Sequence, residues 1–167
     1  MNIQDFLTKK NIRFETLHHE RAFDAQHLAH AIHIPGAQVA KSVMLRVNGG
    51  YKYVAAILPA THEINLAKLS QAVGGSAVQL ADEHELIARC RDCEAGVMPP
   101  FGSQYGLETL IDPSVIANEY IVFEGNGREE AIRMSYRDFY ALEHPTVVEF
   151  AEPASAAGHR HPTGQAN

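Results

Sequence analysis

The spacing of hydrophobic positions changes several times along the chain, which predicts short helices interleaved with short strands. For example, Leu28 and Ile32 lie four positions apart, as on one face of a helix. They follow Asp24, a residue type that commonly caps a helix N-terminus. Helices are expected over residues 2–10, 25–33, 65–73, 82–88 and 136–142. Strands are expected over residues 13–18, 42–48, 52–58, 77–80, 107–111, 119–124, 130–134 and 146–150.

The strongest of these signals is the pair of apolar segments at 42–48 and 52–58. They are separated by Asn48-Gly49-Gly50-Tyr51, a composition typical of a tight hairpin turn. The hairpin and the short strands do not fit the regular strand–helix–strand repeat of a doubly wound parallel sheet. The expected fold class is therefore α/β of the α+β kind, with a mixed, curved sheet or partly open barrel and helices packed outside.

Length and composition indicate one domain followed by a tail. The chain has 167 residues, of which 46% are hydrophobic, enough to bury a substantial core and to exclude wholesale disorder. From Ala151 onward the composition shifts to Ala, Pro, Gly, Ser and His. We expect one domain over residues 1–151 and a disordered tail over residues 152–167.

The charge balance bears on the class of partner. Lys and Arg number 14 against 20 Asp and Glu, a formal net charge of -6, which argues against coating nucleic acid by charge alone but permits a local basic site. No apolar run approaches the roughly 18 residues of a membrane span, and the N-terminus carries no basic and apolar leader. We expect a cytoplasmic protein with no membrane partner.

Three features stand out as candidates for chemistry. Lys41 lies where a turn enters an apolar strand, so its ammonium can serve as a point charge for a phosphate or carboxylate, although most lysines are simply solvated. The segment 96–102 contains Pro99 and Pro100 between glycines, which gives a rigid backbone that a ligand can approach closely, or else a rigid connector. His62 follows a buried strand end, and a surface histidine in a turn is an equal alternative.

The two cysteines offer a different chemistry. Cys90 and Cys93 form a single Cys-x-x-Cys pair, and His84 is the nearest histidine. A structural zinc site needs four ligands, and a redox pair is expected in a thioredoxin-like setting, which the pattern lacks. We therefore expect no metal and no cofactor, and a metal or redox protein remains a weaker alternative.

Four segments, in their order and spacing, resemble a known family. Residues 34–46 read Ile-Pro-Gly-Ala-Gln-Val-Ala-Lys-Ser-Val-Met-Leu-Arg, 56–60 read Ala-Ile-Leu-Pro-Ala, 65–69 read Asn-Leu-Ala-Lys-Leu and 93–102 read Cys-Glu-Ala-Gly-Val-Met-Pro-Pro-Phe-Gly. Together they resemble the YbaK family, whose domain is also inserted in bacterial prolyl-tRNA synthetases as an editing module. The resemblance covers roughly residues 10–150.

The resemblance implies a trans-editing hydrolase that removes a small amino acid from mischarged aminoacyl-tRNA. Lys41 would hold the 3′-terminal phosphate region, while the backbone of the Gly-x-x-x-Pro element, Gly96 to Pro100, would orient the ester and the attacking water. The free 2′-hydroxyl of the terminal adenosine is a candidate participant, and no side-chain nucleophile is required. Lys41, Gly96 and Pro100 are thus the expected catalytic residues. Further substrate contacts are expected from Ser42, His62, Val97, Met98, Phe101, Gly102 and Arg128.

The amino acid pocket is expected to be small. One methylene changes binding by only about 1–3 kcal/mol, so a second sieve is useful after a synthetase has charged its tRNA. Val97, Met98 and Phe101 are the expected walls, and Ala, Ser, Cys and Thr are all small enough to be candidates. The expected partners are the 3′ end of an aminoacyl-tRNA, bound transiently, and as a further candidate an aminoacyl-tRNA synthetase.

One position departs from the family pattern. Some relatives carry a histidine after the strand expected at 119–124, whereas this chain has Arg128 near that place. The departure keeps open a second hypothesis, a catalytically inactive YbaK-like module that binds tRNA or a nucleotide.

Overall fold

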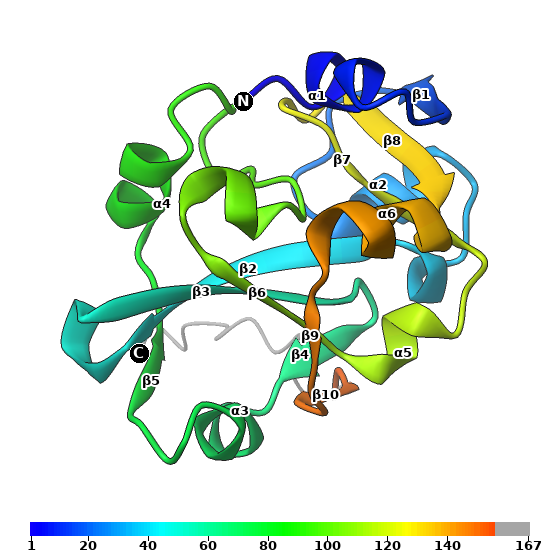
Figure 1. Ribbon diagram of the computed structural model, residues 1–167. Coiled ribbons are helices and arrows are strands. Elements are labelled where there is room, and N and C mark those ends of the chain that lie inside the picture. The colour runs from blue at the N-terminus through cyan, green and yellow to red at the C-terminus, as the bar shows by residue number, and fades with distance from the viewer. Residues whose placement is uncertain (156–167) are drawn as a thin grey trace, which may run out of the picture.

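A five-stranded mixed sheet forms the centre of the computed structural model, which describes residues 1–155 (Figure 1). Its strands lie in the order β5-β2-β3-β6-β9. They are β2 (Ala40–Val47), β3 (Lys52–Pro59), β5 (Val78–Leu80), β6 (Glu108–Ile111) and β9 (Thr146–Val147). β2 runs antiparallel to β3 and β5, whereas β6 is parallel to β3 and β9. The expected hairpin and the mixed sheet are confirmed.

A second sheet packs against this one through a shared hydrophobic cluster. It consists of β1 (Phe14–His18), β8 (Glu130–Ser135) and β7 (Tyr120–Glu124), all antiparallel. A single parallel bridge between Val39 and Val122 joins β7 to the chain just before β2. A short ribbon is formed by β4 (His62–Ile64) and β10 (Ala151–Pro153). Within residues 1–155 the strands do not close into a barrel, so the expected mixed and open arrangement is confirmed.

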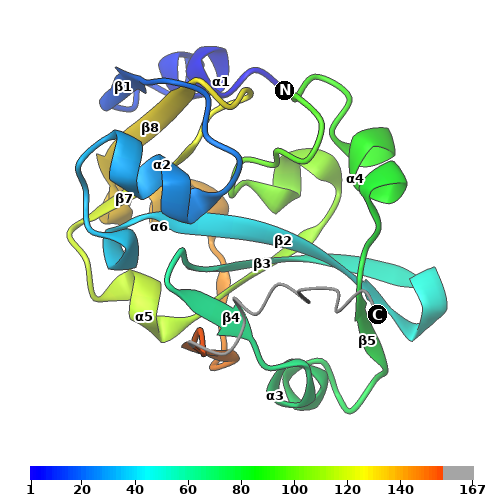
Figure 2. The same ribbon diagram turned by 180° about the vertical axis from the view of Figure 1, so that it is seen from behind.

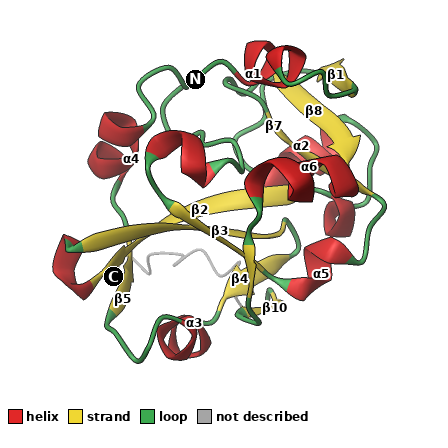
Figure 3. Ribbon diagram, viewed as in Figure 1, coloured by secondary structure: helices red, strands yellow, loops and turns green. Residues whose placement is uncertain are grey.

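The helices lie around the outside of the strands, as Figures 2 and 3 show. They are α1 (Ile3–Lys9), α2 (Ala25–Ala31), α3 (Leu66–Ala72), α4 (Glu83–Arg89), α5 (Pro113–Ile116) and α6 (Tyr136–Glu143). Polar caps fix where several of them begin: the side chains of Asp24, Asn65 and Asp82 each accept a hydrogen bond from the backbone N–H three residues later. These caps explain why local sequence located the helices well.

The central hairpin is buried on both faces, and strand periodicity divides its side chains between two core clusters. On one face Ile57 packs in the cluster that contains Phe101, Phe123 and Phe139. On the other face its neighbour Leu58 packs in the cluster under α3. The three aromatic rings make edge-to-face contacts through Phe101, whose centroid lies 5.9 Å from Phe123 and 5.2 Å from Phe139. This aromatic cluster fixes the end of the loop that precedes β6.

Two parts of the chain differ from the sequence-based expectation. α5 and β4 were not predicted, because both are too short to show a hydrophobic period. The strand expected at 146–150 is shorter, and Glu152 and Pro153, placed at the start of the tail, instead pair with Glu63 and His62. The expected boundary at 152 therefore falls inside a strand, and residues 156–167 of the expected tail lie outside the described residues.

Candidate functional site

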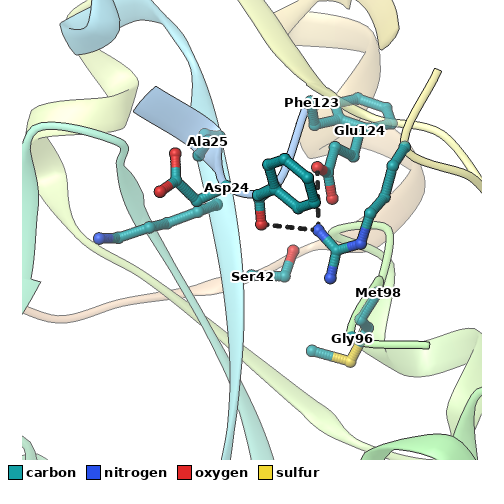
Figure 4. Close-up of a pocket in the computed structure, with 11 residues that line it drawn as sticks. Asp24, Ala25, Ser42, Gly96, Met98, Phe123 and Glu124 are labelled. Atoms are coloured by element: carbon teal, nitrogen blue, oxygen red, sulfur yellow. Dashed lines mark hydrogen bonds and ion pairs between the residues drawn. The ribbon is translucent and has the colours of Figure 1, made fainter. Parts of the chain in front are cut away.

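A pocket of about 190 Å³ opens where four segments of the chain meet (Figure 4). These segments are the start of α2, the start of β2, the end of β7 with the turn after it, and the loop before β6. Its lining consists of Phe23, Asp24, Ala25, Ala40, Lys41, Ser42, Gly96, Met98, Phe123, Glu124 and Arg128. The volume is below the roughly 300–1,000 Å³ of drug-sized ligand sites, so the pocket suits a small chemical group.

Lys41 lies on β2 at the edge of this pocket, paired in register with Leu58 of β3. Successive strand residues point to opposite faces, and Lys41 also lines an adjoining hollow with Asp24, His27 and Ala60. Its side chain is half-buried and forms no ion pair within 4.0 Å among the described residues. Burial lowers the pKa of Lys41, and the carboxylates of Asp24 and Glu63 partly offset this effect. The residue therefore offers an ammonium group to an anion at the junction of two hollows.

The loop from Gly96 to Gly102 forms the opposite wall. Gly96 adopts a φ of 84°, in the left-handed region that favours glycine. Met98 lines the pocket, while Pro100 is buried and is not part of the lining. The loop is tied to itself by bonds from the Val97 N–H to the Glu94 carbonyl and from the Phe101 N–H to the Pro99 carbonyl. It thus presents a rigid backbone at the pocket edge.

Arg128 holds two walls of the pocket together. Its Nη1 donates to the Phe23 carbonyl at 2.8 Å, just before α2, and its Nη2 donates to the Ala95 carbonyl at 3.0 Å, just before the loop. Its own backbone N–H donates to the Glu94 carboxylate at 2.9 Å. The guanidinium is therefore engaged by the protein itself, so its observed contacts are those of a positioning residue.

Glu124, which sequence analysis did not select, places a carboxylate inside the pocket (Figure 4). Its side chain is only 16% exposed, and Oε1 lies 3.7 Å from Nη1 of Arg128. Burial raises the pKa of Glu124 to about 6, with Arg128 and His19 acting in the opposite direction and Glu94 and Asp24 adding to the rise. The available signal in the sequence was a carboxylate at the end of an apolar strand, four residues before an arginine.

The structure brings together Lys41, Ser42, Gly96, Met98 and Arg128, five of the residues expected from the sequence. It does not place the remaining five on the pocket lining.

Val97 and Phe101, expected as pocket walls, are 1% and 0% exposed and face the core instead. Pro100 and Gly102 are also buried, and the nearest side-chain atom to an added Cβ on Gly102 would be Thr109 Oγ1. His62 lies on β4 beside β10, with Nδ1 2.9 Å from the Thr61 hydroxyl oxygen.

The cysteines lie outside this pocket. Both thiols are free, and Cys93 Sγ lies 3.4 Å from the Tyr105 hydroxyl. Burial raises the pKa of Cys90 to about 11, which leaves this thiol a weak nucleophile and a poor metal ligand at neutral pH. Among residues 1–155, no three His, Cys, Asp or Glu side chains gather as a metal site. None of the helices in that range has the length and hydropathy needed to cross a membrane.

Comparison with known proteins gives one family and several similar structures. A sequence model of the aminoacyl-tRNA editing domain matches residues 19–142. A proline–tRNA ligase of Bacillus mycoides (strain KBAB4) is 31% identical over 84 residues, which is 50% of this chain but 14% of that enzyme.

Two solved structures share the fold over nearly the whole chain. The hypothetical protein APE2540 superposes with a TM-score of 0.80 at 14% identity, covering 90% of this chain and 99% of its own. A candidate trans-editing enzyme for prolyl-tRNA synthetase superposes with a TM-score of 0.77 at 18% identity, covering 90% and 94%.

Proposed function

The chain belongs to the aminoacyl-tRNA editing domain family, and on that premise we propose that it is an aminoacyl-tRNA deacylase. It would hydrolyse the ester that links a wrongly attached small amino acid to the 3′ end of a tRNA. The match to proline–tRNA ligase covers only a small part of that enzyme, so amino acid activation is not part of the proposal. The editing domain would act in trans, on tRNA released by a synthetase.

The observation that carries the proposal is the meeting of Lys41 and the Gly96 backbone in one small pocket. The half-buried ammonium of Lys41 would bind the phosphate that precedes the terminal adenosine, because a lysine is a mobile point charge suited to phosphate. The rigid loop beginning at Gly96 would then meet the ester carbonyl. The two elements come from distant parts of the sequence, so their meeting needs the tertiary fold.

The chemistry proposed is attack of water on an already activated ester. Water adds to the ester carbonyl, the bond to the ribose oxygen breaks, and a proton reaches that oxygen, which leaves free amino acid and a tRNA hydroxyl. Positioning and fixed backbone dipoles supply the acceleration, and the neighbouring ribose hydroxyl of the substrate is suited to relay the proton. No serine or cysteine nucleophile is needed, so Cys90 and Cys93 have no part in the step.

The pocket dimensions support a small amino acid. Its volume is about 190 Å³, with Ala25, Met98 and Phe123 as apolar walls. Phe123 is held by the aromatic cluster and Met98 is 6% exposed, so neither wall is free to move outward. A rigid pocket of this size would accept alanyl, seryl, cysteinyl and threonyl esters and exclude larger ones.

The proposal is tested by a deacylation panel. Alanyl, seryl, cysteinyl and threonyl esters are presented on tRNA-Pro and on their cognate tRNAs, with leucyl-tRNA as the oversized control. Hydrolysis of at least one small ester, with leucyl-tRNA spared, supports the proposal and names the substrate. Hydrolysis of none, with or without an added synthetase, contradicts it.

A binding module without catalysis is the second candidate function. The observation that favours it is Arg128, which lies near the place where some relatives carry a histidine and which donates hydrogen bonds to two backbone carbonyls. Retained binding of a 3′-terminal tRNA fragment, together with no ester hydrolysis in the panel, would support this reading.

A further inference from the structure

The carboxylate of Glu124 has a buried oxygen, Oε1, that accepts no hydrogen bond from the described residues. The side chain is 16% exposed. A buried, ionised oxygen without a donor is costly, because it has lost water without gaining a partner. The site therefore has an unused capacity to accept a charged N–H donor.

The neighbouring groups do not fill that capacity. The terminal nitrogens of Arg128 donate to carbonyls at 2.8 and 3.0 Å, and neither donates to Glu124, because the 3.7 Å approach is an ion pair without a hydrogen bond. The other carboxylate of the pocket, Asp24, accepts from the N–H and the ring Nδ1 of His27 and caps α2. Of the two pocket carboxylates, Glu124 is thus the one left to meet a ligand.

We propose that Glu124 receives the α-ammonium group of the aminoacyl ester and makes the site selective for esters with a free amine. This inference rests on the proposed deacylase function. The aminoacyl end of the substrate carries a positive amine, whereas the adjacent tRNA backbone carries negative phosphate. Lys41 lines the pocket from the start of β2 and Glu124 from the end of β7, so the pocket has separate places for the two substrate charges.

The acid–base properties of the pocket agree with this role. Burial raises the pKa of Glu124 to about 6; the charges facing it are Arg128 and His19, which lower the pKa, and Glu94 and Asp24, which raise it. The carboxylate is therefore mostly ionised at neutral pH and becomes neutral below about pH 6. A substrate amine loses its proton at higher pH, with an ordinary α-amino value of about 7.7–8.0. Recognition of the α-ammonium group by Glu124 would be strongest at pH values between the pKa of Glu124 and that of the substrate amine.

The test compares two isosteric esters in the wild type and in Glu124→Gln. One is alanyl-tRNA, and the other is lactyl-tRNA, in which a neutral hydroxyl replaces the amine; if another amino acid is preferred, its α-hydroxy analogue is used. We expect the wild type to favour the amine ester, and Glu124→Gln to lower kcat/KM for that ester about 10- to 100-fold while changing the hydroxy ester less than about twofold. Glu129→Gln, which removes an exposed charge from the same turn outside the pocket, is the matched control and should keep the preference.

The outcomes separate this inference from the proposed function. Equal losses on both esters would place Glu124 in the chemical step and overturn amine recognition. An unchanged preference in Glu124→Gln would overturn it as well. If the wild type hydrolyses neither these esters nor any other in the panel, the proposed function fails first. Thermal unfolding of each variant tests whether misfolding is the cause of a loss. As a second readout, we expect the wild type to lose its preference for the amine ester as the pH is lowered through 6.

Discussion

The guanidinium of Arg128 lies directly over the α-carbon of Gly96, so closely that a side-chain Cβ at Gly96 would overlap Nη2. The same guanidinium bonds the carbonyls of Phe23 and Ala95. A glycine and an arginine 32 positions apart in the chain thus define the distance between two walls of the pocket. This contact connects backbone conformation at Gly96 with the shape of the site.

Gly96→Ala should damage the site more than the fold. The substitution strains a φ of 84° and displaces Arg128, so we expect a loss of about 1 kcal/mol in unfolding free energy and at least a tenfold fall in kcat/KM for the edited ester. Gly74→Ala is the control, because Gly74 has a φ of 81° and open space around its α-carbon. Urea unfolding and deacylation are measured on both. Equal activities in the two variants would argue against a role for the contact between Gly96 and Arg128.

Ala25→Leu should narrow the amino acid pocket. Ala25 begins α2 and lines the pocket, and leucine is a good helix former, so the helix is expected to remain. We expect hydrolysis of threonyl or seryl esters to fall more than that of a glycyl ester, measured as kcat/KM on each. Ala67→Leu, at an exposed position in the first turn of α3, should leave the order of preference unchanged. A uniform loss across all esters would contradict the assignment of Ala25 to the wall.

Asp112 joins the end of β6 to the last described strand, and its removal should lower stability. Its Oδ2 accepts from the N–H groups of Phe150 at 2.9 Å and Ala151 at 2.8 Å, and its Oδ1 accepts from Ser114. In Asp112→Asn an amide NH₂ group replaces one accepting oxygen and faces one of these N–H or O–H donors. The free energy of unfolding should fall by about 1–3 kcal/mol at pH 7. Urea unfolding measures the change, and an unaltered midpoint would contradict it.

The same carboxylate predicts a pH dependence. Burial alone would raise the pKa of Asp112, but the bonds from Ser114, Phe150 and Ala151 outweigh it and lower the pKa below its ordinary value of 3.8. A group with a lowered folded-state pKa contributes stability above its unfolded value and loses that contribution as the pH falls. The difference in unfolding free energy between the wild type and Asp112→Asn should therefore shrink below about pH 4. A constant difference down to pH 2 would contradict this assignment.

Local signals made most of the fold predictable. Asp24, Asn65 and Asp82 mark helix starts by their side-chain chemistry, and the turn of Asn48, Gly49 and Gly50 identifies the hairpin, with φ of 52°, 68° and 101°. Each of these features depends on a few neighbouring residues. The sequence was therefore informative about elements and about the class of sheet.

The composition of the site was less predictable because it depends on distant contacts. Phe101 was expected in the pocket wall beside Gly96, but Phe6, Phe123 and Phe139 draw its ring into the core. Glu124 enters the pocket only because the bridge between Val39 and Val122 brings the end of β7 to the start of β2. Neither the burial of the Phe101 ring nor the position of Glu124 can be recognised from hydrophobic periodicity in the sequence.

The most direct test of the account is the dependence of ester hydrolysis on Lys41. Lys41→Ala is compared with the wild type in single-turnover deacylation of the preferred aminoacyl-tRNA, with Lys52→Ala, which removes an exposed lysine at the start of β3, as the control. We predict that Lys41→Ala folds normally and that its deacylation rate falls at least about tenfold. The deacylation rate of Lys52→Ala should stay near that of the wild type. Wild-type turnover in a folded Lys41→Ala would remove this lysine from the mechanism and contradict the account.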